Sequence, residues 1–289
     1  MTAPDFPLES LLAQLLRPSI HQVLEALTQI STNCSVEQIH QTRVSIRTLR
    51  AYLDTFGSLL CKSETRVFSK QLQWLNSILG PLRDADVTLG LLTKDLNQAA
   101  SSGHRAEELK LHLMRELAEE REAQVATLPE LLGGRTALSL TSALSDWLIA
   151  LPMRGKVLAL SSQNQQVLIS QCLEQSRQKL YRLATQASRR PSRARLHGVR
   201  IQAKKVQYSF ATAQALGVVK DTETISLAGE LHKLLGRYQD LSILATWLNA
   251  QELASDKHLH IKRIWMLETK QQRNKTIGQY QALMKKGLT

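Results

Sequence analysis

Apolar side chains recur every three or four residues along most of the chain, which is the spacing of one helix face. Leucines follow this spacing from Leu8 to Ile30, and Ser35 with Gln38, typical of a capping box, opens a second helix that runs through Leu60. No segment keeps the period-two alternation of a half-buried strand. The pattern therefore predicts an all-α fold.

Glycine and proline interrupt this pattern and predict where helices end. Gly80 ends one helix, and Pro81 is well placed as the first residue of the next. Further breaks are predicted at Gly103, Pro129, Gly133-Gly134, Pro152, Pro191, Gly217 and Gly236. The longest apolar runs, such as 147–151, fall far short of the ~20 residues that a membrane-spanning helix needs, so we expect no membrane partner.

The first residues and the cysteines indicate a soluble cytoplasmic protein. No cationic stretch followed by an apolar core, the mark of a signal peptide, is visible at the beginning of the sequence. The three cysteines, Cys34, Cys61 and Cys172, are scattered without CxxC spacing. They fit a reducing compartment and exclude a metal held by thiolates.

The chain also repeats itself. In residues 39–52 and 196–208, His40, Arg43 and Arg47 recur as His197, Arg200 and Lys204 at an offset of 157, and residues 79–84 match residues 235–240 at an offset of 156. Two matched pairs at nearly one offset indicate a duplicated helical unit. We predict two similar bundles related by a pseudo-twofold axis, with a boundary near residues 151–155.

The two predicted halves, residues 1–152 and 153–289, differ strongly in charge. The 289-residue chain carries a formal charge of +12, but residues 1–150 hold 14 basic and 17 acidic side chains, and residues 151–289 hold 23 and 8. Ten of the cations lie between Glu174 and Lys205. This concentration indicates a polyanion partner and predicts that the second half supplies most of the affinity.

A cationic stripe accompanies each repeated helix. At about 100° per residue, the basic residues of the first copy fall within an arc of about 80°, beside the apolar arc of Ile46 and Leu49. Like charges so close repel each other, so a bound anion is the natural reason to keep them. The candidate anion-binding residues are His40, Arg43, Arg47, Arg50, Arg177, Arg182, Arg189, His197, Arg200, Lys204 and Lys205. Arg83, Asp84, Asp240 and Tyr208 are candidates for a supporting or orienting role.

The paired segments that begin at His40 and His197 resemble the CHAD domain, the "conserved histidine α-helical domain", and the two Leu-Gly segments resemble its second signature. The resemblance covers nearly the whole chain. It implies two antiparallel four-helix bundles, binding of inorganic polyphosphate by the basic residues of both copies, and association with polyphosphate granules. Thr48, Gln207 and Ala211 depart from the family pattern, and the change at Thr48 makes the basic stripe of the first half thinner.

Two other functions compete with polyphosphate binding. An RNA-binding protein would normally add aromatic stacking platforms, and aromatic residues make up only 4% of this chain. A metal-dependent phosphohydrolase would need metal-binding carboxylates, and Asp84 with Asp86 is the only tight acidic pair near the motif. No glycine-rich phosphate loop is present. We therefore expect a non-catalytic binder without cofactor or metal, and the sequence leaves its oligomeric state open.

Overall fold

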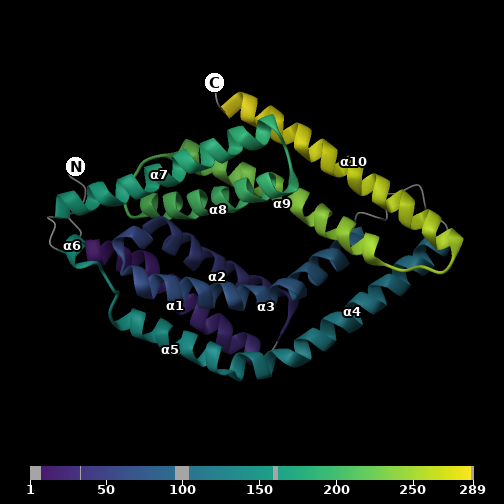
Figure 1. Cartoon of the computed structure of the whole chain (residues 1–289), viewed down its shortest axis with the longest axis horizontal. Coiled ribbons are helices and arrows are strands. Elements are labelled where there is room, and N and C mark those ends of the chain that lie inside the picture. The colour runs from purple at the N-terminus through teal and green to yellow at the C-terminus, as the bar shows by residue number, and fades with distance from the viewer. Residues whose placement is uncertain (1–7, 33, 95–103, 159–161, 288–289) are drawn as a thin grey trace. The chain divides into compact units, whose positions relative to one another are not determined.

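The computed structural model describes residues 8–32, 34–94, 104–158 and 162–287, which are helical almost throughout (Figure 1). The elements are α1 (Leu8–Thr32), α2 (Val36–Phe56), η1 (Gly57–Leu59), α3 (Lys62–Lys94), α4 (His104–Gly133), α5 (Arg135–Ile149), α6 (Gly155–Leu158), α7 (Ser162–Arg189), α8 (Arg193–Ala215), α9 (Thr222–Ala250) and α10 (Asp256–Gly287). Within these residues, strand pairing is confined to one isolated bridge between Leu60 and Met153. The all-α prediction is confirmed. Of the helices described, none is long and apolar enough to cross a membrane.

The residues form two compact units, each with more contacts within itself than with the other, and each unit combines segments from both halves of the sequence. The first unit comprises Met1–Leu79 and Leu128–His232, and the second comprises Gly80–Thr127 and Lys233–Thr289. This grouping differs from the predicted halves 1–152 and 153–289, because α2 packs against α7 and α8 of the other half. The pseudo-twofold relation between the halves stays a prediction.

The first unit is built on contacts among α1, α2, α7 and α8, which lie together in Figure 1. Their buried apolar side chains keep the helical spacing that the sequence predicts. On α2 these side chains are Ile46, Leu49, Leu53 and Phe56, and on α8 they are Val199, Ala203, Val206 and Phe210. Helix α5 packs on α1 and stacks Trp147 on Phe68 of α3, with ring centroids 4.5 Å apart. The two repeated helices are therefore core elements of one unit.

The second unit has its own core, formed by α10 and by parts of α3, α4 and α9. Leucines of α4 and α9 surround Trp265 of α10, which is almost fully buried. Beside this core, the Nε atom of Arg121 donates to Oδ1 of Asp86 at 2.6 Å, and the Asp86 side chain is 0% exposed. The second carboxylate of the Asp84–Asp86 pair thus serves a buried ion pair.

The prediction that Gly80 ends a helix is wrong, since α3 continues through Pro81 to Lys94. Pro81 is exposed, while Leu79 and Leu82 on either side of it are buried. Burial of this apolar stripe outweighs the hydrogen bond that a proline removes from a helix interior. Helix α4 likewise continues through Pro129. Both prolines lie within two residues of the points at which the chain passes from one compact unit to the other.

The remaining predicted breaks have mixed outcomes. Helix α4 ends at Gly133, and α7 and α8 are separated around Pro191, as predicted. Gly217 follows α8 and adopts a φ of 74°, a conformation that glycine reaches without steric cost. Gly236 lies inside α9, and Gly103 lies outside the described residues.

Candidate anion-binding site

The site begins with α2, whose start is fixed by the predicted capping box. The hydroxyl of Ser35 accepts from the backbone N–H of Gln38 at 3.2 Å, and the Gln38 side chain accepts from the backbone N–H of Ser35. The side chain of Arg43 is drawn into the unit: it is 9% exposed, and its Nη1 donates to the carbonyl of Asn76 on α3 at 2.9 Å. The other candidates on α2, which are half-buried, are His40, Arg47 and Arg50.

Helix α8 supplies the second set of basic residues. It begins at Ser192, whose hydroxyl accepts from the backbone N–H of Arg195 at 3.3 Å. Lys204 is only 8% exposed, and its Nζ lies 5.0 Å from the centroid of the Tyr208 ring. Arg200, one helical turn earlier, is half-buried. The ring of Tyr208 offers the ammonium a cation–π contact, which replaces only part of the water that burial removes.

Helices α2 and α8 pack against each other through polar as well as apolar contacts. The Tyr52 hydroxyl lies 2.8 Å from Oγ1 of Thr212, and the Ser209 hydroxyl lies 3.1 Å from Oγ1 of Thr55. This packing brings basic residues from both copies of the repeat together. We call the set Arg43, Arg47, Arg200 and Lys204 the cationic cluster.

The pKa of the Lys204 ammonium reflects its burial and the positive charge that gathers in the cationic cluster. Burial and, to a smaller extent, the positive charges of Arg47, Arg200 and Arg43 together lower this pKa from 10.5 to about 7. Both causes disfavour the charged ammonium. A bound anion would supply the missing opposite charge, so the cluster has the electrostatic character of an anion site.

His232, ten residues after the first residue of α9, belongs to the same site and is absent from the predicted set. Burial and, to a smaller extent, the positive charges of Lys204, Arg200 and Arg47 together lower its pKa to about 4. The imidazole is therefore neutral at neutral pH. A signal for it does exist in the sequence, since His232 lies three residues before Leu235, where the second repeated segment begins.

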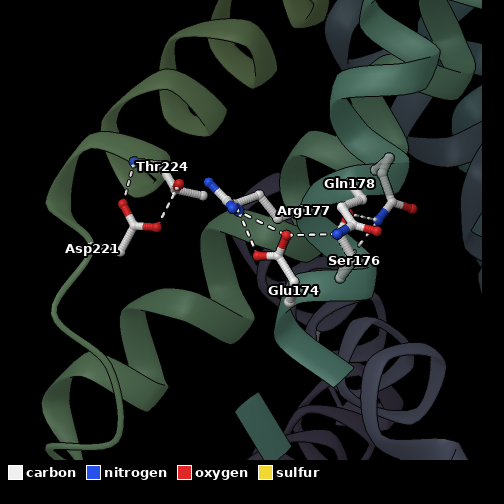
Figure 2. Close-up of polar contacts among 7 residues, drawn as sticks. Glu174, Ser176, Arg177, Gln178, Asp221 and Thr224 are labelled. Atoms are coloured by element: carbon white, nitrogen blue, oxygen red, sulfur yellow. Dashed lines mark hydrogen bonds and ion pairs between the residues drawn. The ribbon is translucent and has the colours of Figure 1, made fainter. Parts of the chain in front are cut away.

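Two of the predicted cations are engaged by carboxylates of the chain itself. Figure 2 shows the guanidinium of Arg177 between Glu174 and the start of α9, where Asp221 caps the helix through Thr224. Arg177 donates to Glu174 from Nε at 2.8 Å and from Nη2 at 3.0 Å, and this contact lowers the pKa of the Glu174 carboxyl. Lys205 forms an ion pair with Asp54 of α2.

The other candidates lie outside the cationic cluster. Arg182, Arg189 and His197 are exposed, and each lies on α7 or α8. The supporting residues divide between the units: Tyr208 lies in the first, and Arg83, Asp84 and Asp240 lie in the second. Burial raises the pKa of the Tyr208 hydroxyl, and Arg47 acts in the opposite direction. The binding and orienting roles of all these residues stay predictions.

Comparison with known proteins identifies the fold. The family model for the CHAD domain matches residues 8–249. The structure is similar to that of PptA from Streptomyces chartreusis, with a TM-score of 0.74, 16% identity and coverage of 98% of this chain and 99% of that one. It is also similar to the CHAD domain from the plant Ricinus communis, with a TM-score of 0.75, 19% identity and coverage of 98% and 93%. No curated protein matches the sequence. The extent of the family match shows that the chain belongs to the CHAD domain family.

Proposed function

We propose that this protein binds inorganic polyphosphate through the cationic cluster, without chemical turnover, and that it associates with polyphosphate granules in the cell. The observation that carries the proposal is the burial of Lys204 among three guanidinium groups contributed by α2 and α8. Such a cluster destabilises an empty protein, and a multivalent anion relieves the repulsion. Polyphosphate supplies repeated negative charge, and arginine forks match its oxygens.

The aromatic residues near the cluster favour a polyanion without bases. Tyr52 is buried, and its hydroxyl is held by Thr212. The ring of Tyr208 is in contact with the ammonium of Lys204. Tyr52 is therefore closed to a base of RNA, and one face of the Tyr208 ring is already in contact with an ammonium, whereas RNA binders normally gain about 1–3 kcal/mol per stacked base. Polyphosphate therefore fits the site better than single-stranded nucleic acid.

The acidic residues do not favour a metal-dependent phosphohydrolase. Asp86 is committed to its ion pair with Arg121. In the part of the chain that the structure describes, no group of three histidine, cysteine, aspartate or glutamate side chains is placed to hold a metal ion. The chemistry on offer is charge pairing and hydrogen bonding, which supports binding without hydrolysis.

The test compares two double variants that remove the same charge. Arg47→Ala/Arg200→Ala should weaken binding of long-chain polyphosphate on the order of a hundredfold or more, because each charge-assisted hydrogen bond contributes about 1.5–3 kcal/mol. Arg66→Ala/Arg135→Ala, which removes two exposed arginines, should bind nearly as well as the unaltered protein. Fluorescence anisotropy with labelled polyphosphate measures both.

Parallel titrations with single-stranded RNA and duplex DNA distinguish the ligand classes. RNA binding as tight as polyphosphate binding, at the same salt concentration, would contradict the proposal. A phosphate-release assay with Mg²⁺ or Mn²⁺ tests turnover, and release above the background without protein would contradict non-catalytic binding.

A further inference from the structure

A polar cavity of about 250 Å³ lies in the first unit where α2, α7 and α8 meet. None of its lining residues belongs to the cationic cluster. The lining side chains that matter here are Asp54 from α2, Gln175, Ser176 and Lys179 from α7, and Gln202 and Lys205 from α8. The cavity is thus lined by two ammonium groups and one carboxylate.

The floor of the cavity is firmly built. Gln202 is buried, and its Nε2 donates both to the carbonyl and to the hydroxyl of Ser176, each at 2.9 Å. Above this floor, the side chain of Lys205 is 21% exposed and that of Asp54 is 45% exposed. The two form an ion pair, while Lys179 is exposed at the rim. The charged groups of the cavity can therefore reach solvent, while its polar base stays fixed.

Asp54 continues the basic face of α2. It follows Arg47 by seven residues and Arg50 by four, so helical spacing places all three on one side of the helix. An anionic chain that runs along this side past Arg50 next meets a carboxylate on Lys205. The carboxylate occupies the position that a phosphate oxygen would take on that ammonium.

We propose that this cavity is a second oxoanion subsite, in which Asp54 is an internal competitor that a phosphate group displaces from Lys205. A partly exposed ion pair is weak, so a phosphate group that contacts both the Lys205 and the Lys179 ammonium can replace a carboxylate that is paired with Lys205 alone. The subsite rests on the proposed function only for the source of its phosphate groups. Its consequence is that Asp54 limits the affinity of the protein for long chains.

The decisive variant is Asp54→Asn, which keeps the size of the side chain and removes its charge. Affinity for pyrophosphate and for long-chain polyphosphate, measured by isothermal titration calorimetry, should rise roughly two- to fivefold, the factor that corresponds to loss of a weak, partly exposed ion pair. Asp146→Asn, on the exposed side of α5, changes the net charge equally and should leave both affinities unchanged. Adding Lys205→Met to Asp54→Asn should abolish the gain.

A variant that lacks two arginines of the cationic cluster allows the subsite to be tested independently of that cluster. In Arg47→Ala/Arg200→Ala, Asp54→Asn should still raise the affinity for pyrophosphate. If that gain appears while the unaltered protein binds no polyphosphate, the subsite stands and the proposed function fails. If polyphosphate binds and depends on Arg47 and Arg200, but Asp54→Asn changes nothing, the proposed function stands and the subsite is refuted.

A purely structural role for the ion pair gives a different result. If Asp54 only fastens α2 to α8, Asp54→Asn and the smaller Asp54→Ser should lower the melting temperature without any gain in affinity, and this outcome would overturn the proposal. An equal gain in Asp146→Asn would also overturn it, because the effect would then come from net charge alone.

Discussion

Replacement of Lys204 by methionine should stabilise this protein. Methionine has nearly the same length and flexibility as lysine, so Lys204→Met removes the charge without opening a cavity. In the folded protein the ammonium is buried among Arg43, Arg47 and Arg200, and its pKa falls from 10.5 to about 7. Since a shift of one pKa unit corresponds to 1.36 kcal/mol, this drop lowers the free energy of unfolding by about 5 kcal/mol when the amine is charged.

The size of the effect depends on pH in a defined direction. Above pH 10.5 the amine is neutral in both the folded and the unfolded chain, and no penalty exists. Between 10.5 and about 7 the unfolded chain holds a proton that the folded one has released, so the free energy of unfolding falls as the pH falls. Below about pH 7 the folded protein must carry the buried charge, and the full penalty applies.

Urea denaturation followed by circular dichroism measures this penalty. At pH 6, Lys204→Met should raise the free energy of unfolding by about 2–5 kcal/mol, and the difference from the unaltered protein should shrink between pH 7 and pH 9. Lys220→Met, at an exposed position, serves as the control and should change stability by less than about 0.5 kcal/mol. A variant less stable than the unaltered protein at pH 6, or a difference that does not depend on pH, would refute the reasoning.

Two further predictions follow from the same structure. Affinity for polyphosphate should fall as the pH rises above about 7, by up to about tenfold per pH unit, because Lys204 must then take up a proton to bind; calorimetric titrations at pH 6, 7 and 8 measure this, and an equal slope in Lys204→Met would contradict it. In the second unit, Asp86→Ala should lower the free energy of unfolding by about 3–5 kcal/mol, because it leaves Arg121 without its buried carboxylate. Denaturant titration tests the second prediction, and a loss below about 1 kcal/mol would show that the pair is screened by solvent.

The sequence predicts the helices well because their signals are local. The capping box of Ser35 and Gln38 forms as predicted, and the apolar spacing of α2 and α8 identifies the side chains that become buried. Helix breaks are predicted at Pro81 and Pro129, because proline removes a backbone hydrogen bond, but both helices continue. The burial that outweighs this loss depends on segments distant in the sequence. The grouping into two units is hidden for the same reason, since no local pattern states that α2 packs against α8.

The candidate site is predictable only in part. Helical spacing selects Arg43, Arg47, Arg200 and Lys204 as candidates, and the structure brings these four together. Spacing on one helix cannot show that Lys205, turned by about 100° from Lys204, meets a carboxylate of another helix. Net charge favours the second half as the main source of affinity, while α2 and α8 each contribute two residues to the cationic cluster. The division of affinity between the two halves stays a prediction.

The neutral form of Lys204 links the stability of the empty protein to the binding of an anion. At neutral pH the amine is only partly protonated, and His232 is uncharged, so the empty site carries less positive charge than its composition suggests. An anion that enters raises the pKa of Lys204 and draws a proton onto it. The bound state therefore gains a positive charge that the empty state avoids. Under the proposed function, burial among guanidinium groups, which destabilises the fold, therefore allows this site to strengthen its attraction for an anion only when the anion is present.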